Sequence, residues 1–121
     1  MQYMLLIYID PEQEARLTPE EGEALLDRYR RVKGEIEAEG KLVAALKLPR
    51  RSPKSLRLEG DGLRATDGPF VETKELLGGF FIVDCDSIDE AVEIAARIPA
   101  AETGCVEVRG VMDLDAMFAA Q

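Results

Sequence analysis

Residues 66 to 80, with the sequence TDGPFVETKELLGGF, bring a dense group of polar side chains to the entry of an apolar strand. Asp67 stands near the start of this stretch, and Glu72, Lys74 and Glu75 follow just before a run of apolar residues. A carboxylate whose pKa is raised by burial can serve as a general base. The pattern therefore predicts a group of polar candidate site residues at the start of a central strand.

A structural interpretation of the same stretch stays open, because its residue types are also those of loops. Asp67-Gly68-Pro69 has the composition of a turn: aspartate bonds its own backbone, glycine accepts a positive φ, and proline presets the next dihedral angle. The Glu-Thr-Lys-Glu segment that follows is typical of a solvated loop, and Phe70 suits an anchor in a core or a dimer interface. Gly78-Gly79 permits a close approach of the backbone before the buried strand.

Other residue types that carry chemistry are few. The chain contains no histidine and two cysteines, Cys85 and Cys105. Two cysteines without a nearby histidine make neither a zinc site nor a disulfide framework, so we expect free thiols, no metal and no cofactor. Tyr3 and Tyr8 are expected to pack with their hydroxyls at the rim of a cleft, which makes them further candidates for ligand binding.

The composition is that of a single globular domain. The chain has 121 residues, 46% of them hydrophobic and 32% charged, and we expect one domain over 1–121 with a short C-terminal tail at 113–121. Its net charge of −9 disfavours nucleic-acid binding, because an acidic surface repels phosphate backbones. The longest apolar run, Gln2 to Ile9, is far shorter than a membrane span, and no signal peptide precedes it, so we expect a cytoplasmic protein without membrane contact.

A basic patch interrupts this acidic chain at Lys47, Arg50, Arg51, Lys54 and Arg57. The patch can attract an anionic ligand or partner, or its charges can protect an edge strand against aggregation. Both interpretations stay open, and the second is the commoner use of such charges.

Helix signals stand at two places in the chain. Thr18, Pro19 and Glu21 predict a helix that begins with a capping box and ends before Gly40. The segment from Ser87 to Glu90 repeats the capping-box pattern and predicts a second helix before Pro99. The apolar stripes of the two helices are expected to comprise Leu25, Tyr29, Val32 and Ile36 in the first and Ile88, Ala91, Val92, Ala95 and Ile98 in the second.

The remaining segments predict an α+β fold. Strands are expected at 2–9, 41–48, 79–85 and 105–111, with a hairpin at 55–66 and a short helix from 113. This order is the split βαβ arrangement of a ferredoxin-like fold with an inserted β-hairpin. The four sheet strands would then lie in the order 4-1-3-2, with both helices on one face.

The strands are apolar on both sides, which predicts a homodimer. The first strand carries Tyr3, Leu5 and Ile7 on one side and Met4 and Leu6 on the other. Two helices cover one face only, so we expect the open face of the sheet to pack against a second copy. The alternative is that the hairpin and the C-terminal tail cover this face within one chain.

The sequence resembles the DGPF-domain proteins, a branch of the YCII-related family, over nearly its whole length. The resemblance rests on Asp67 to Phe70, on Glu72 to Glu75, on Gly78 to Phe80, on the opening Tyr3 to Tyr8 and on Asp84 to Glu90. It implies a dimeric α/β-barrel fold of ferredoxin-like type. It also implies a bacterial source, frequent association with genes for extracytoplasmic-function sigma factors, and no established activity for most members.

The resemblance also bears on function. Family members have been proposed to use a His–Asp pair, and some relatives are dehydrochlorinases or lactone isomerases, but without histidine this chain cannot form such a pair. Asp67 matches the family's Asp-Gly turn, which implies a ligand-binding or acid/base role with Glu72, Lys74 or Glu75. We expect a small-molecule-binding accessory or regulatory protein. The alternative is a cofactor-free lyase or isomerase acting on a small polar ring compound.

Overall fold

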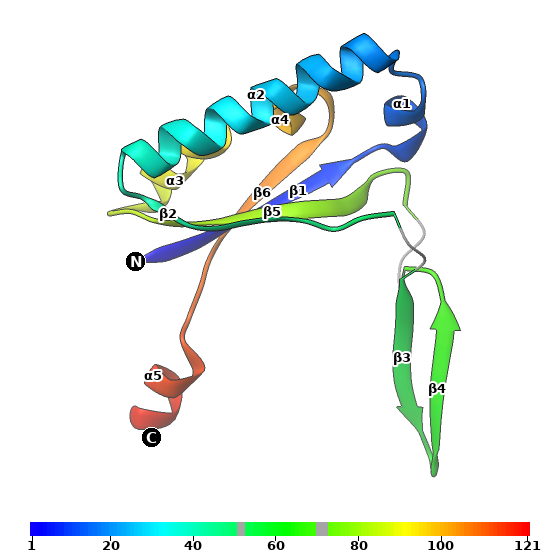
Figure 1. Cartoon of the computed structure of the whole chain (residues 1–121). Helices are drawn as coiled ribbons and strands as arrows, with labels where there is room; N and C mark the ends of the chain where they lie inside the picture. Colours follow the sequence, from blue (N-terminus) through cyan, green and yellow to red (C-terminus); the bar gives the residue numbers. More distant parts are fainter. Residues whose placement is uncertain (51–52, 70–72) are drawn as a thin grey trace.

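The computed structural model describes residues 1–50, 53–69 and 73–121 (Figure 1). Its elements follow one another along the chain as β1 (Gln2–Ile9), α1 (Pro11–Ala15), α2 (Pro19–Ala38), β2 (Leu42–Lys47), β3 (Lys54–Glu59), β4 (Gly62–Asp67), β5 (Leu76–Asp84), α3 (Ile88–Ala95), α4 (Ala100–Thr103), β6 (Cys105–Gly110) and α5 (Leu114–Ala119). Within the described ranges, no helix is long and apolar enough to cross a membrane. The predicted α+β class is confirmed.

Four strands form one antiparallel sheet in the order β2-β5-β1-β6. This is the predicted order of the sheet strands, with β1 and β5 in the centre. The sheet of the single chain is open and does not close into a barrel. Strands β3 and β4 pair only with each other, as the predicted hairpin, around a turn in which Gly60 has a φ of +56°.

The capping signals operate in α2 as predicted. The Thr18 side chain accepts a hydrogen bond from the Glu21 backbone, and the Glu21 carboxylate accepts one from the Thr18 backbone. Gly40 follows the helix with a φ of +72°, a conformation that favours glycine. This reciprocal pair fixes the first turn of α2, which will form one wall of the cavity described below.

The second helix differs from its prediction. Ser87 caps α3, but the Glu90 carboxylate accepts from the Asp86 backbone instead of completing a capping box. The helix ends at Ala95, and the chain turns through Ile98 into the short helix α4. The prediction that Ile88 and Val92 belong to the apolar stripe is wrong, because both side chains are about half exposed. The buried apolar residues here are Ala91, Ile94, Ala95, Ile98 and Ala100.

The core lies between one face of the sheet and the helices. Leu5, Ile36, Val83 and Ile98 are fully buried in it. In Figure 1 all helices except α5 lie on this side of the sheet. Alternation along the strands places Tyr3, Leu5 and Ile7 of β1 in the core, so the even-numbered residues of β1 point to the opposite face.

The opposite face of the sheet is apolar at its centre, and none of the described helices and strands lies across it (Figure 1). Register places Met4 and Leu6 of β1 beside Ile82 and Phe80 of β5 on this face. The hairpin β3–β4 and helix α5 extend below the sheet at two separate places (Figure 1). The alternative of a cover within one chain is therefore wrong, since these two segments form no continuous layer.

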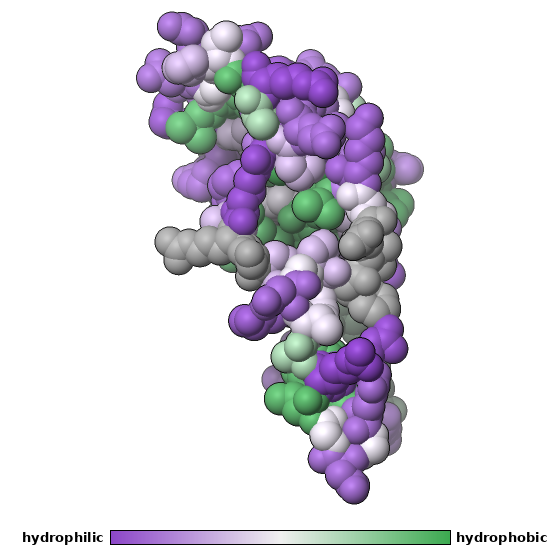
Figure 2. Space-filling model, turned by 90° about the vertical axis from the view of Figure 1, so that its right-hand side faces the viewer, coloured by the Kyte–Doolittle hydropathy of each residue, from purple (hydrophilic) through white to green (hydrophobic). Residues whose placement is uncertain are grey.

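Both extended segments expose apolar side chains of their own. One face of the hairpin carries Leu56, Leu58 and Leu63, which are 62%, 80% and 65% exposed. Figure 2 shows this apolar surface at the lower end of the molecule. Helix α5 exposes Leu114 and Phe118. Such surfaces are typical of segments that contact another molecule.

Candidate functional site

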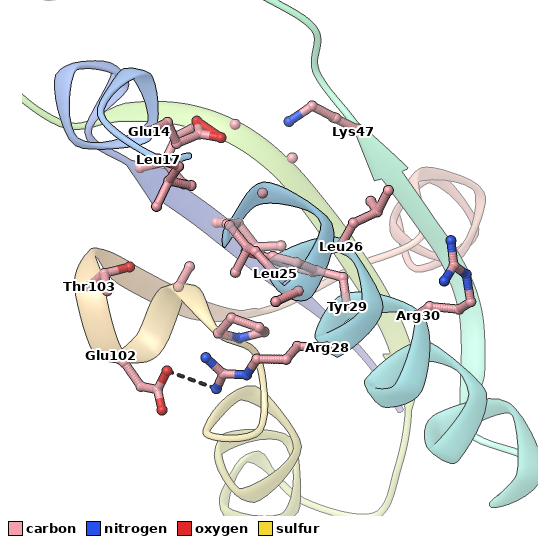
Figure 3. Close-up of a pocket in the computed structure, with 18 of the residues that line it drawn as sticks. Glu14, Leu17, Leu25, Leu26, Arg28, Tyr29, Arg30, Lys47, Glu102 and Thr103 are labelled. Atoms are coloured by element: carbon pink, nitrogen blue, oxygen red, sulfur yellow. Dashed lines mark ion pairs between the residues drawn. The ribbon is translucent and has the colours of Figure 1, made fainter. Parts of the chain in front are cut away.

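A hollow lies where the N-terminal part of α2 leaves the sheet. Val32 and Ile36 hold the C-terminal half of α2 against the core, whereas Leu25 and Tyr29 in its N-terminal half are only partly buried. A cavity of about 980 Å³ opens between this half of the helix, the sheet and the short helices α1 and α4 (Figure 3). This volume is typical of sites for small organic molecules.

The walls of the cavity are mainly apolar. The sheet supplies Ile7, Ala45 and Phe81, and α2 supplies Leu25 and Tyr29. Further apolar contributions come from Leu17 after α1 and from Pro99 and Ala100 at the start of α4. If α2 ran parallel and close to the sheet, it would cover these strand residues. Because the N-terminal part of the helix lies farther from the sheet, the residues stay uncovered and the cavity forms between them and the helix.

Gly78 and Gly79 line the same cavity and are required by the packing of the strands around them. A Cβ at Gly78 would lie 2.8 Å from side-chain carbons of Ile9. A Cβ at Gly79 would lie 2.7 Å from the carbonyl oxygen of Leu46 on the neighbouring strand. The predicted close approach of the backbone is confirmed, and it keeps side chains out of the cavity floor at this point.

Tyr29 is a partly buried titratable group in the cavity wall. Burial raises the pKa of its hydroxyl, and the adjacent backbone of Ala100 partly opposes this change. The Glu14 carboxylate adds to the increase in the pKa of Tyr29. Tyr29 therefore presents a protonated hydroxyl, a hydrogen-bond donor, at neutral pH.

Ion pairs surround the opening of the cavity. Arg28 Nη2 lies 2.8 Å from Glu102 Oε2, which links α2 to α4 across one end (Figure 3). At the other end, Arg50 Nη2 lies 3.4 Å from Glu14 Oε2 and donates a hydrogen bond to the carbonyl oxygen of Pro11. These contacts tie the elements that border the cavity to one another.

Most residues predicted for the site lie away from this cavity. Asp67 is at the end of β4, on the hairpin, where its side chain is 78% exposed and its Oδ1 lies 2.6 Å from Lys54 Nζ. Lys74 is closer to the cavity: its Nζ lies 3.8 Å from Oδ2 of Asp10, a residue of the cavity wall. Glu72 and Phe70 lie outside the described residues.

Glu75 occupies a different position from Asp67, at the start of β5. Its Oε2 is buried and has no hydrogen-bond partner within the described part of the chain. The atom lies against Gly104, where a Cβ would come within 3.2 Å of it and within 2.2 Å of the Tyr8 carbonyl oxygen. The structure therefore separates Asp67 from Glu75, although they are eight positions apart in the sequence.

The two tyrosines proposed for a cleft rim point to opposite faces of the sheet. Tyr3 is 6% exposed and belongs to the core between sheet and helices. Tyr8 lies on the open face, where its hydroxyl is 3.5 Å from Glu107 Oε1. Neither lines the cavity. Within the described ranges, no three or more acidic or cysteine side chains are grouped to hold a metal ion.

The cavity residues that the sequence analysis did not propose come from α1, α2 and α4. Glu14, Arg28 and Tyr29 are the clearest examples. Leu25 and Tyr29 were expected in the core stripe of α2, and nothing in the periodicity indicates that the stripe separates from the sheet halfway along. The one available signal is Gly22, a poor helix former in the half of α2 that rises over the cavity.

Comparisons with known proteins agree on one family. The sequence model of the YCII-related domain matches residues 1–115. An uncharacterised protein of Rhizobium meliloti (strain 1021) is 36% identical over 112 residues, which span 90% of this chain and 90% of that protein. The matched range contains every element of the four-stranded sheet and the whole cavity.

Proposed function

Because this chain belongs to the YCII-related domain family, we propose that it is a small-molecule-binding accessory or regulatory domain whose ligand occupies the cavity beneath α2. The observation that carries this proposal is a volume of about 980 Å³ with apolar walls and a ring of charged groups at its opening. Sites for small molecules typically combine such walls with a few polar groups that orient the ligand. The sigma-factor pathway implied by the family resemblance is the proposed regulatory setting.

The alternative of a cofactor-free lyase or isomerase has less support from the same cavity. Such an enzyme needs a group that accepts a proton from its substrate. The raised pKa of Tyr29 favours its protonated form, and the carboxylates of Glu14 and Glu102 are engaged in ion pairs. Binding therefore requires nothing beyond the groups present, whereas a catalytic carboxylate would have to leave its ion pair or, for Glu21, its hydrogen bond from the Thr18 backbone.

We propose in addition that the working form is a ferredoxin-like homodimer joined through the open face of the sheet. Phe80, Ile82, Met4 and Leu6 supply the apolar centre of that face. The exposed leucines of the hairpin and helix α5 flank the same side of the sheet and would enlarge the contact (Figure 1). A second copy supplies the matching apolar surface, because a two-fold axis brings identical patches together.

The predicted site residues enter this proposal unequally. Lys74 is placed at the cavity by its approach to Asp10, and Glu75 offers a carboxylate oxygen that lacks a partner within the described chain. Asp67 is a separate candidate on the hairpin. Asn at position 67 keeps the turn geometry, so Asp67→Asn should change the unfolding free energy by less than about 1 kcal/mol. A loss of ligand-induced stabilisation in this variant would place the ligand at the hairpin.

Two matched glycine substitutions in α2 test the cavity. Gly22 lines the cavity and Gly34 does not, and a Cβ at either position meets no atom within 4 Å. Gly22→Leu should therefore fill part of the cavity without a clash, while Gly34→Leu gives the same helix change at an exposed position. The measurement is the fluorescence of Nile red, a neutral apolar dye, titrated with each variant.

We expect Gly22→Leu to weaken dye binding about tenfold and Gly34→Leu to leave it unchanged, since burial of a leucine-sized volume in the site competes directly with the dye. Equal binding by the two variants and the parent protein would mean that the dye, if it binds, occupies another surface. That result would remove the cavity from the proposed function.

A further inference from the structure

The charged groups around the cavity opening are Asp10, Glu14, Glu21, Arg28, Arg30, Lys33, Lys47 and Glu102. The cations among them, with one exception, have ion-pair partners within the described residues. Beyond the pairs of Asp10, Glu14, Arg28 and Glu102 described above, Arg30 pairs with Asp27 and Lys33 pairs with Glu37. The Glu21 carboxylate accepts the Thr18 backbone N–H at 2.9 Å.

Lys47 is the exception. Its ammonium group has no ion-pair or hydrogen-bond partner among the residues that the structure describes, although it lines the cavity. The other cations of the opening, Arg28, Arg30 and Lys33, each have a carboxylate partner. Lys47 is therefore the cation that remains available to an anionic ligand at the opening.

The strand register explains why Lys47 reaches the cavity. Lys47 pairs with Gly79, two positions after the pair of Ala45 with Phe81, so its side chain leaves β2 on the helix-facing side of the sheet. Gly79 carries no side chain, so nothing at that position separates the Lys47 side chain from the apolar walls. In Figure 3 the Lys47 side chain projects from β2 toward the side of the opening where Glu14 stands.

We infer that the cavity takes a small apolar molecule with one carboxylate, with its apolar body against Phe81 and Leu25 and its carboxylate at Lys47. This inference rests on the proposed function and adds the chemical class of the ligand. A singly charged anion fits because one ammonium group is unpaired. A dianion such as a phosphate monoester would retain excess charge beside the carboxylates of Glu14 and Asp10, which disfavours it.

Three ligands with the same eight-carbon chain test the inference. Octanoate, 1-octanol and octylammonium carry a negative, a neutral and a positive head group, and each is titrated against the protein with bound Nile red. We expect octanoate to displace the dye at the lowest concentration and octylammonium at the highest. Lys47→Met keeps the apolar stem and removes the charge, so it should weaken octanoate about fivefold and leave 1-octanol unchanged.

Lys54→Met is the control, because it makes the same change in net charge on the hairpin, outside the cavity lining. It should leave all three displacement curves unchanged. The ligand class is refuted if 1-octanol displaces the dye and octanoate displaces it no better, or if octanoate keeps its advantage over 1-octanol in Lys47→Met. In both cases the cavity remains a binding site. Loss of octanoate binding in Lys54→Met instead would place the anion at the hairpin and also refute the inference. If none of the ligands displaces the dye and Gly22→Leu has no effect, the proposed function itself fails.

Discussion

Phe80 and Phe81 are adjacent in β5 but face opposite sides of the sheet, which gives a sharp test of the proposed dimer. Phe81 pairs with Leu5 and Ala45, faces the helices and is 6% exposed. Phe80 pairs with Leu6 and Leu46 on the open face and is only partly covered in the single chain. The same substitution at the two positions should therefore have different consequences.

The expected effects follow from what surrounds each ring. In Phe81→Asp, loss of the buried ring costs about 3–5 kcal/mol, and an unpaired buried carboxylate adds several more. That sum approaches the whole stability of a typical domain, about 5–15 kcal/mol, so this variant should not fold. In Phe80→Asp the single chain should lose less, about 1–2 kcal/mol, because the ring is only partly buried and the new carboxylate can reach solvent.

The dimer should respond to Phe80→Asp far more than the single chain does. A carboxylate buried without a partner in the interface costs about 3–5 kcal/mol, which weakens association by roughly 100- to 5,000-fold. Light scattering should give twice the 13.4 kDa chain mass for the parent protein and the chain mass for Phe80→Asp. Circular dichroism should show that the variant keeps its secondary structure and a cooperative thermal transition.

Three results would refute this reasoning. A parent protein that stays at the chain mass at every concentration has no dimer to disrupt. A Phe80→Asp variant that dimerises as the parent does would show that the open face is not the interface. Folding of Phe81→Asp with normal stability would contradict the assignment of the two faces of β5.

Three further predictions concern stability and reactivity. Gly22→Leu should raise the melting temperature more than Gly34→Leu does. Both substitutions gain about 0.7 kcal/mol of helix propensity, but only the leucine at position 22 buries its side chain. Equal shifts in melting temperature would contradict the position of the cavity. Glu90→Gln should lower the free energy of unfolding at pH 7 and make it depend less on pH in acid. The hydrogen bond from Lys41 lowers the pKa of Glu90, so the stabilisation by this carboxylate is present at neutral pH and is lost as the pH falls through the lowered pKa. Unfolding by urea at several pH values measures this. Burial raises the pKa of the Cys85 thiol, so this thiol should react with a disulfide reagent more slowly in the folded than in the unfolded protein, and equal rates would refute its burial.

The parts of the fold that depend on local signals could be predicted from the sequence. The capping box at Thr18 and Glu21, the turn at Gly60 and the two-sided apolar pattern of β1 each result from residues close together in the chain. Together with the split βαβ pattern, these signals were sufficient for the six strands, the two longer helices and the strand order of the sheet. Helix α1 was not expected, because Asp10-Pro11 also has the residue types that end a strand, whereas in the structure Asp10 caps a new helix by accepting from the Glu12 backbone.

The cavity could not be predicted in the same way, because it depends on distances between elements. The period of the α2 stripe is the same over Leu25 and Tyr29 as over Val32 and Ile36, although the first pair borders a cavity and the second is buried. Part of the cavity wall comes from α1 and α4, and neither short helix was expected. The separation of Asp67 from Glu75 has a similar origin, since it depends on where the hairpin leaves the sheet.

The unequal packing of α2 also divides the helix into segments of different local stability. Amide protons near Val32 and Ile36 can exchange with solvent only when the core opens, whereas those near Leu25 are covered on one side by a cavity instead of packed atoms. Hydrogen exchange should therefore be slow in the last turns of α2 and faster in the turns after Glu21. The faster segment is the one that a molecule must pass to reach Phe81, so the same fluctuations that weaken the start of the helix give access to the interior.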